Sequence, residues 1–171
     1  IREVVDFLKM PERFGEIASL DQVVPAEHLA RLGKRAVGGR HLAVPDPEKA
    51  GRYPLYLEAC RTAFRALNGP NLAGTVTGPW TTATGLRGTQ ELIFDAIDDP
   101  GFVDDLMAFT TEVTKALGGK LLETGISLTL GEAACSCSLI SPTLYRRFNK
   151  HQHQEFVRFF EEKKKGLSMH V

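Results

Sequence analysis

The chain has 171 residues, of which 43% are hydrophobic and 25% are charged, and its 21 basic residues balance its 21 acidic ones. Its size and composition are those of one globular domain, and its zero formal charge excludes a bulk electrostatic attraction to nucleic acid or to an anionic membrane surface. Its apolar runs are shorter than the roughly 18 residues of a membrane span, so we expect a cytoplasmic protein with a single domain over residues 1–171.

The first part of the chain carries the fewest sequence signals for helices and strands. Apolar residues at helical spacing predict a short helix over residues 1–10, and a strand-like stub followed by a helical turn is expected within residues 20–32. Residues 33–52 are rich in Gly and Pro and are predicted to be loop. A clear amphipathic pattern predicts a helix over residues 54–67, and Cys60 within it is interpreted as a small core residue.

The last hundred residues alternate β-prone segments with helical ones. In chain order we predict a strand over 72–77, a Gly- and Thr-rich loop over 78–88, a short helix over 90–97, a long helix from Asp99-Pro100, a strand from Ile126 after a stop at Gly125, a helix from Pro142 to about Lys165, and a strand over 167–171. Such alternation predicts a parallel sheet. A closed eight-stranded α/β barrel needs about 250 residues, so this chain would supply roughly half.

The two ends of the chain are consistent with a partial barrel. The chain opens on Ile1 and stops at Val171 within a predicted strand, so we expect a piece of a longer protein. Its three cysteines, Cys60, Cys135 and Cys137, are too few for a disulfide framework and are expected to be free thiols.

The stretch from Ile126 to Pro142 has the features of an active-site loop, because a short strand leads into Glu132, Cys135 and Cys137 before the next helix starts. Barrel enzymes place their catalytic groups at such strand ends. Glu132 is interpreted as an acid–base group or a metal ligand, with a solvated loop carboxylate as the alternative. The two cysteines could also bind metal, but Cys-x-Cys without a second pair favours simple packing of small residues.

Other candidate residues lie on both sides of this stretch. Trp80, Thr81 and Thr84 would give a pocket one apolar wall with a few hydroxyls, which suits an aromatic ether, a corrinoid face or a pterin; Trp80 as a plain core residue fits equally well. Arg87 is interpreted as a surface arginine rather than an anion-binding group. His151 and His153 are two residues apart, hence on different helix faces, and both are expected in solvent.

Several short motifs resemble, in their order and spacing, the uroporphyrinogen decarboxylase superfamily over about residues 72–171. They are Gly78-Pro79-Trp80-Thr81, Gly85-Leu86-Arg87-Gly88, Asp99-Pro100-Gly101-Phe102-Val103, the strand after Gly125, Ser141-Pro142-Thr143-Leu144-Tyr145, and Leu167-Ser168-Met169-His170. The resemblance implies a TIM (β/α)8 barrel of which only part is present. It also implies one of two activities: cofactor-free decarboxylation of uroporphyrinogen, or methyl transfer to or from a corrinoid protein, usually with zinc.

Three departures count against the decarboxylases. Their tyrosine after the Pro-Trp-Thr block falls at Gly85, and their strand-end serine falls at Cys135. Their N-terminal arginine motif has no match in residues 1–40.

The zinc methyltransferases carry His-x-Cys where this chain reads His170-Val171, so His170 is a predicted zinc ligand and a cysteine is expected at the position after Val171. The resemblance therefore favours a methyltransferase that works between a corrinoid carrier protein and a small thiol, pterin or methoxy compound. Zinc would be held by His170 and Glu132, with Trp80, Thr81 and Thr84 at the substrate. A uroporphyrinogen decarboxylase is the alternative, a non-catalytic barrel fragment that binds a partner is a third hypothesis, and a homodimer is left open.

Overall fold

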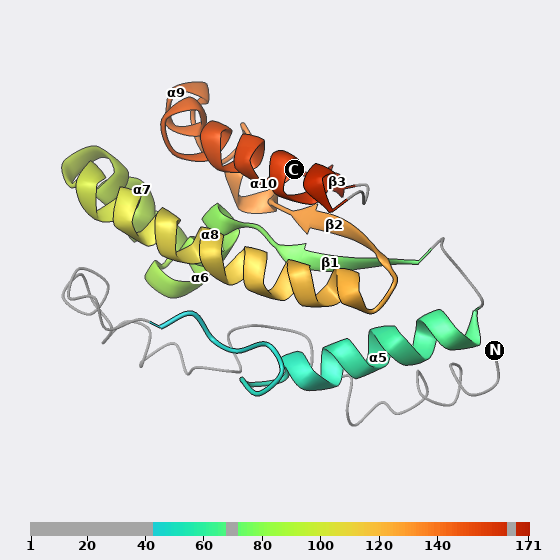
Figure 1. Ribbon diagram of the computed structural model, residues 1–171. Coiled ribbons are helices and arrows are strands. Elements are labelled where there is room, and N and C mark those ends of the chain that lie inside the picture. Colours follow the sequence, from blue (N-terminus) through green and yellow to red (C-terminus); the bar gives the residue numbers. More distant parts are fainter. Residues whose placement is uncertain (1–42, 68–71, 164–166) are drawn as a thin grey trace.

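Three parallel strands form the sheet at the centre of the computed structural model, which describes residues 43–67, 72–163 and 167–171 (Figure 1). The strands are β1 (Ala73–Thr77), β2 (Ser127–Gly131) and β3 (Leu167–His170), and they lie side by side in that order. All pairings are parallel, as the alternation of strands and helices predicts. The elements expected in residues 1–10 and 20–32, and the first part of the 33–52 loop, lie outside the described residues. Residues 43–52 form turns and irregular chain, as expected.

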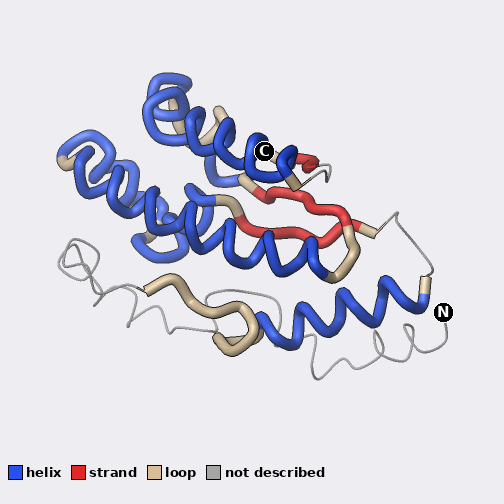
Figure 2. The backbone as a smooth tube through the Cα atoms, viewed as in Figure 1, coloured by secondary structure: helices blue, strands red, loops and turns tan. Residues whose placement is uncertain are grey.

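The helices connect these strands and cover the sheet, as the tube in Figure 2 shows. In chain order they are α5 (Tyr53–Ala66), α6 (Pro79–Arg87), α7 (Thr89–Asp98), α8 (Pro100–Glu123), a 3-10 turn (Ala133–Cys135), and then α9 (Pro142–Leu144), a π-helical turn (Tyr145–Asn149) and α10 (Lys150–Glu162) in direct succession. The helices expected over 54–67, over 90–97, after Asp99 and after Pro142 are confirmed. None of the described helices combines the length and the apolar character that a membrane crossing requires.

The loop expected over residues 78–88 is wrong, because this segment forms α6. Thr and Gly are poor helix formers, and local propensity therefore argued for loop. Pro79 nevertheless fits the first turn of a helix, and Gly88 ends it with φ of 88°. The free N–H groups at its start are bound by the carboxylate of Glu132, far along the chain, which no local pattern reveals.

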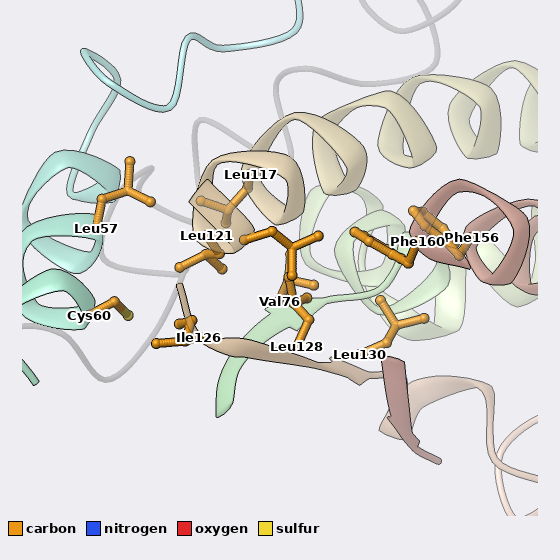
Figure 3. Close-up of a cluster of buried hydrophobic side chains, with 11 residues drawn as sticks. Leu57, Cys60, Val76, Leu117, Leu121, Ile126, Leu128, Leu130, Phe156 and Phe160 are labelled. Carbon is orange, nitrogen blue, oxygen red and sulfur yellow. The ribbon is translucent and has the colours of Figure 1, made fainter. Parts of the chain in front are cut away.

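A sheet cluster of buried apolar side chains joins α5, α8 and α10 to the sheet (Figure 3). It contains Leu57, Cys60, Val76, Leu117, Leu121, Leu122, Ile126, Leu128, Leu130, Phe156 and Phe160. The core position expected for Cys60 is confirmed. Gly125, at φ of 94°, turns the chain from α8 into β2, and its missing Cβ leaves room for the Phe64 ring, which an added Cβ would meet at 2.9 Å.

A tryptophan cluster lies beyond the carboxyl ends of the strands and holds α6, α7 and the start of α8 together. It contains Trp80, Ala83, Leu92, Ala96, Phe102, Val103, Leu106, Met107, Cys135, Ile140 and Phe148. The helical segment from Pro142 to Glu162 spans both clusters, with Phe148 in the tryptophan cluster and Phe156 and Phe160 in the sheet cluster. This segment therefore connects the two clusters.

Candidate functional site

The candidate site begins where the three strands end in register. Thr77 lies opposite Gly131, and Gly131 lies opposite His170. The ladder continues for one more step, because Gly78 donates its N–H to the Gly131 carbonyl at 2.9 Å and Glu132 donates its N–H to the His170 carbonyl at 2.8 Å. Since β1 and β2 run in the same direction, α6 and the loop after β2 leave the sheet at one end (Figure 1). This register brings residues 52 positions apart in the sequence, Trp80 and Glu132, into direct contact.

Glu132 caps the start of α6 with its side chain, which is 0% exposed. Its Oε1 accepts the Trp80 N–H at 3.0 Å, and its Oε2 accepts both the Thr81 N–H at 3.0 Å and the Thr81 hydroxyl at 2.8 Å. The first N–H groups of a helix lack partners within it, and the helix dipole favours a negative charge there. These contacts offset the cost of burying a carboxylate.

Gly78 makes room for this carboxylate. A Cβ placed on Gly78 would lie 2.2 Å from Glu132 Cγ and 2.3 Å from Oε1, distances that no pair of non-bonded atoms tolerates. The Gly-Pro-Trp-Thr motif therefore has a physical role at each end: the glycine admits the glutamate, and the backbone after the proline binds it.

Cys135 and His153 complete a cluster of metal-ligand type around Glu132. One donor atom from each of these three buried side chains lies within 4.8 Å of the others. His153 Nε2 is 3.6 Å from Glu132 Oε1, which is beyond hydrogen-bond reach, and it has no hydrogen-bond partner within the described part of the chain. The other ring nitrogen, Nδ1, lies 3.1 Å from the hydroxyl of Tyr145.

The thiol of Cys135 is held in its protonated form by its surroundings. Burial, reinforced by the negative charge of Glu132, raises the pKa of Cys135 to about 12. A buried thiol of this kind is a poor nucleophile by itself. It becomes a thiolate readily only where a cation compensates the charge, which is the role of a metal ion in a cysteine-containing site.

The structure brings some of the predicted site residues together and separates others. Glu132 and Cys135 lie in the buried cluster, whereas the side chains of Cys137 and His170 are exposed. His170 is nevertheless at the same end of the sheet, because its carbonyl binds the Glu132 backbone. The solvated alternative for Glu132 is wrong, since the side chain is fully buried.

Trp80, Thr81 and Thr84, the predicted substrate residues, all lie on α6. Trp80 is 0% exposed, packs against Phe148 with ring centroids 6.0 Å apart, and leaves its indole N–H without a partner among the described residues. Thr81 binds Glu132, and the Thr84 hydroxyl donates to the Thr81 carbonyl at 2.7 Å. Contact of these three residues with a substrate remains a prediction.

Arg87 is not a free surface arginine. Its Nε donates to Asp95 Oδ2 at 2.6 Å, and the Asp95 side chain is buried. This ion pair joins the end of α6 to α7 beside the tryptophan cluster.

His153 is the site residue that the sequence analysis missed. The solvent position predicted for both histidines is wrong for His153, which is 5% exposed, whereas His151 is exposed. The signal was available: His153 precedes Phe156 by three residues, and Phe156 and Phe160 mark the buried face of the helix. That two histidines lie on different faces implies that one of them can face the core.

Comparisons with known proteins identify the family and the fold of the chain. The family model described as uroporphyrinogen decarboxylase (URO-D) matches residues 25–171. The chain belongs to the uroporphyrinogen decarboxylase family. The match begins further toward the N-terminus than the motifs that carry the resemblance, and no curated protein matches the chain.

A methyltransferase from Methanosarcina mazei has a similar solved structure. The TM-score is 0.68 at 24% sequence identity, and the match covers 77% of this chain and 39% of that protein. This likeness shows the fold. The chain is part of a TIM barrel of the uroporphyrinogen decarboxylase type, and it spans well under half the length of the structure that it matches.

Proposed function

We propose that the chain supplies part of the active site of a methyltransferase of the uroporphyrinogen decarboxylase family. In this proposal a methyl group passes between a corrinoid carrier protein and a small thiol, pterin or methoxy compound. A zinc ion is held at the carboxyl end of β2 by Glu132, Cys135 and His153. The name of the Methanosarcina structure supports the choice of reaction, and the chemistry of the site supports the choice of metal.

The buried group of three ligands carries this proposal. A carboxylate oxygen, a thiol sulfur and an imidazole nitrogen within 4.8 Å of one another are the donor types that zinc prefers. Three protein ligands would leave a fourth position for a substrate, as in catalytic zinc sites. His153 Nε2 has no hydrogen-bond partner among the described residues, which fits the same interpretation, because a buried polar atom without a hydrogen bond costs free energy unless something binds it.

Zinc, when bound, would supply a Lewis acid that lowers the pKa of a substrate thiol or polarises the oxygen of a methoxy group. The chain's own residues prepare that site. The start of α6 fixes Glu132, so only one arrangement of its oxygens is available to a ligand. The tryptophan cluster excludes water from one side of the site. Cys135 must release the proton on Sγ before it can act as a ligand.

His170 remains a second predicted ligand. Its backbone is joined to Glu132, but its side chain is exposed rather than directed into the buried cluster. Zinc bound through His153 would lie in the buried cluster, whereas zinc bound through His170 would lie outside it.

His153→Ala is expected to weaken zinc binding by about 100-fold or more, because it removes one of three protein ligands. The measurement is competition with a chromophoric chelator on the full chain. His151→Ala is the matched control, since His151 lies on the exposed side of the same helix, and it should bind zinc as tightly as the wild type. Loss of zinc on His170→Ala but not on His153→Ala would instead assign the metal to the sequence-predicted ligand.

The reaction itself is tested by spectroscopy. With methylcobalamin and an excess of a small thiol, the full chain with zinc is expected to accelerate loss of the methyl–cobalt spectrum. The zinc-free protein is expected to leave the rate of that loss unchanged. Release of carbon dioxide from uroporphyrinogen would overturn this assignment and favour the decarboxylase. If the protein shows neither activity but still binds a partner, the non-catalytic hypothesis is favoured.

A further inference from the structure

We propose that Tyr145 is a positioning residue that fixes the His153 ring so that Nε2 faces Glu132 and Cys135. The inference rests on the metal centre of the proposed function and extends it to a residue outside the three ligands. The Tyr145 hydroxyl lies 3.1 Å from His153 Nδ1, and the two rings pack with their centroids 5.6 Å apart. Tyr145 therefore restrains the imidazole both by a hydrogen bond and by contact between the rings.

A neutral imidazole has one nitrogen that carries a proton and one that carries a lone pair. The hydrogen bond made by one of them decides which nitrogen carries the proton. If Nε2 is to bind a metal, Nδ1 must carry the proton and needs an acceptor. His153 is too buried for water to serve freely, so the Tyr145 oxygen takes that role. Because a hydroxyl can both donate and accept, the same contact also satisfies Nδ1 in the metal-free protein.

The helix is built to allow this contact. Tyr145 and His153 are eight residues apart, and in a regular α-helix such residues point about 80° apart around the axis. The π-helical turn Tyr145–Asn149 takes up one additional residue, which brings Tyr145 close to the face of His153. Such turns within α-helices occur often at functional sites, and this one starts at the residue in question.

The test compares Tyr145→Phe with the wild type in the full chain. The variant keeps the ring contact and removes only the hydroxyl, so zinc should bind about 10–100-fold more weakly by chelator competition. Tyr56→Phe is the control: Tyr56 also hydrogen-bonds through its hydroxyl, but to the backbone of Thr75 in the sheet, and its zinc affinity should be unchanged. A wild-type chain that binds zinc and a Tyr145→Phe chain that binds it equally well would overturn the inference.

Nitrogen chemical shifts of the histidine rings give a readout that a general loss of stability would not produce. In the metal-free wild type the His153 Nδ1 shift should be that of a hydrogen-bonded nitrogen, and in Tyr145→Phe it should move because the hydroxyl is gone. An unchanged Nδ1 shift in the variant contradicts the role of Tyr145. If the wild type binds no zinc, the proposed metal centre is wrong, while these spectra still decide whether Tyr145 fixes the ring.

Discussion

Glu132→Gln is expected to lower the free energy of unfolding by about 2–4 kcal/mol, although the side chain keeps its shape. The carboxylate accepts three hydrogen bonds, two of them from the first backbone N–H groups of α6. A carboxamide has one acceptor oxygen, and its NH2 group would face a donor. At least one buried donor would lose its partner, and the favourable charge at the helix start would be gone. Urea denaturation of the metal-free protein measures the change.

The matched control is Glu112→Gln. Glu112 lies on α8 and pairs with Lys115, but its side chain is 58% exposed. Exposed ion pairs of this kind contribute little, so this variant should remain within about 0.5 kcal/mol of the wild type. Equal, small effects of both substitutions would show that Glu132 does not hold α6 to the sheet.

Gly78→Ala is expected to destabilise the protein by about 3 kcal/mol or more, because the added methyl group occupies the space of Glu132. The new Cβ would lie 2.2 Å from Glu132 Cγ, so the glutamate must leave its place and the start of α6 loses its cap. The midpoint temperature of thermal unfolding and the affinity for zinc should both fall, since Glu132 caps the helix and also belongs to the proposed metal site.

Gly85→Ala provides the comparison within the same helix. Apart from its chain neighbours and the nearby backbone of its own helix, a Cβ on Gly85 would meet no atom of the described chain within 4 Å, and alanine is the better helix former by about 1 kcal/mol. This variant should therefore be neutral or more stable. The idea that Gly78 is needed for close approach of Glu132 would be wrong if both glycine variants behaved alike.

The helices and strands could be predicted from the sequence where local signals agree with the final environment. The long helix after Asp99-Pro100 has a helix cap, a proline in its first turn and repeated apolar residues, and Gly125 marks its end. The strand after Gly125 carries buried residues at alternate positions. In these places nothing distant in the chain competes with the local preference.

The helix α6 could not be predicted in this way, because its stability comes from a residue far away in the sequence. Its Thr- and Gly-rich composition favours loop, and the carboxylate that binds its free N–H groups belongs to the end of another strand. The strand end at Glu132 could be recognised from the sequence. Its partner His153 could not be paired with it, because that contact depends on how the next helix packs across the sheet.

The π-helical turn Tyr145–Asn149 also has a consequence for which sequences this fold can tolerate. The turn behaves like an insertion of a single residue in an otherwise regular helix. Deleting one residue within it would therefore leave a regular α-helix whose segments before and after the turn face as they do now. Phe156 and Phe160 would stay against the sheet, and His153 would stay beside Glu132. A relative that shares the site can therefore have one residue fewer between Ser141-Pro142 and His153, in a helix without the π-helical turn.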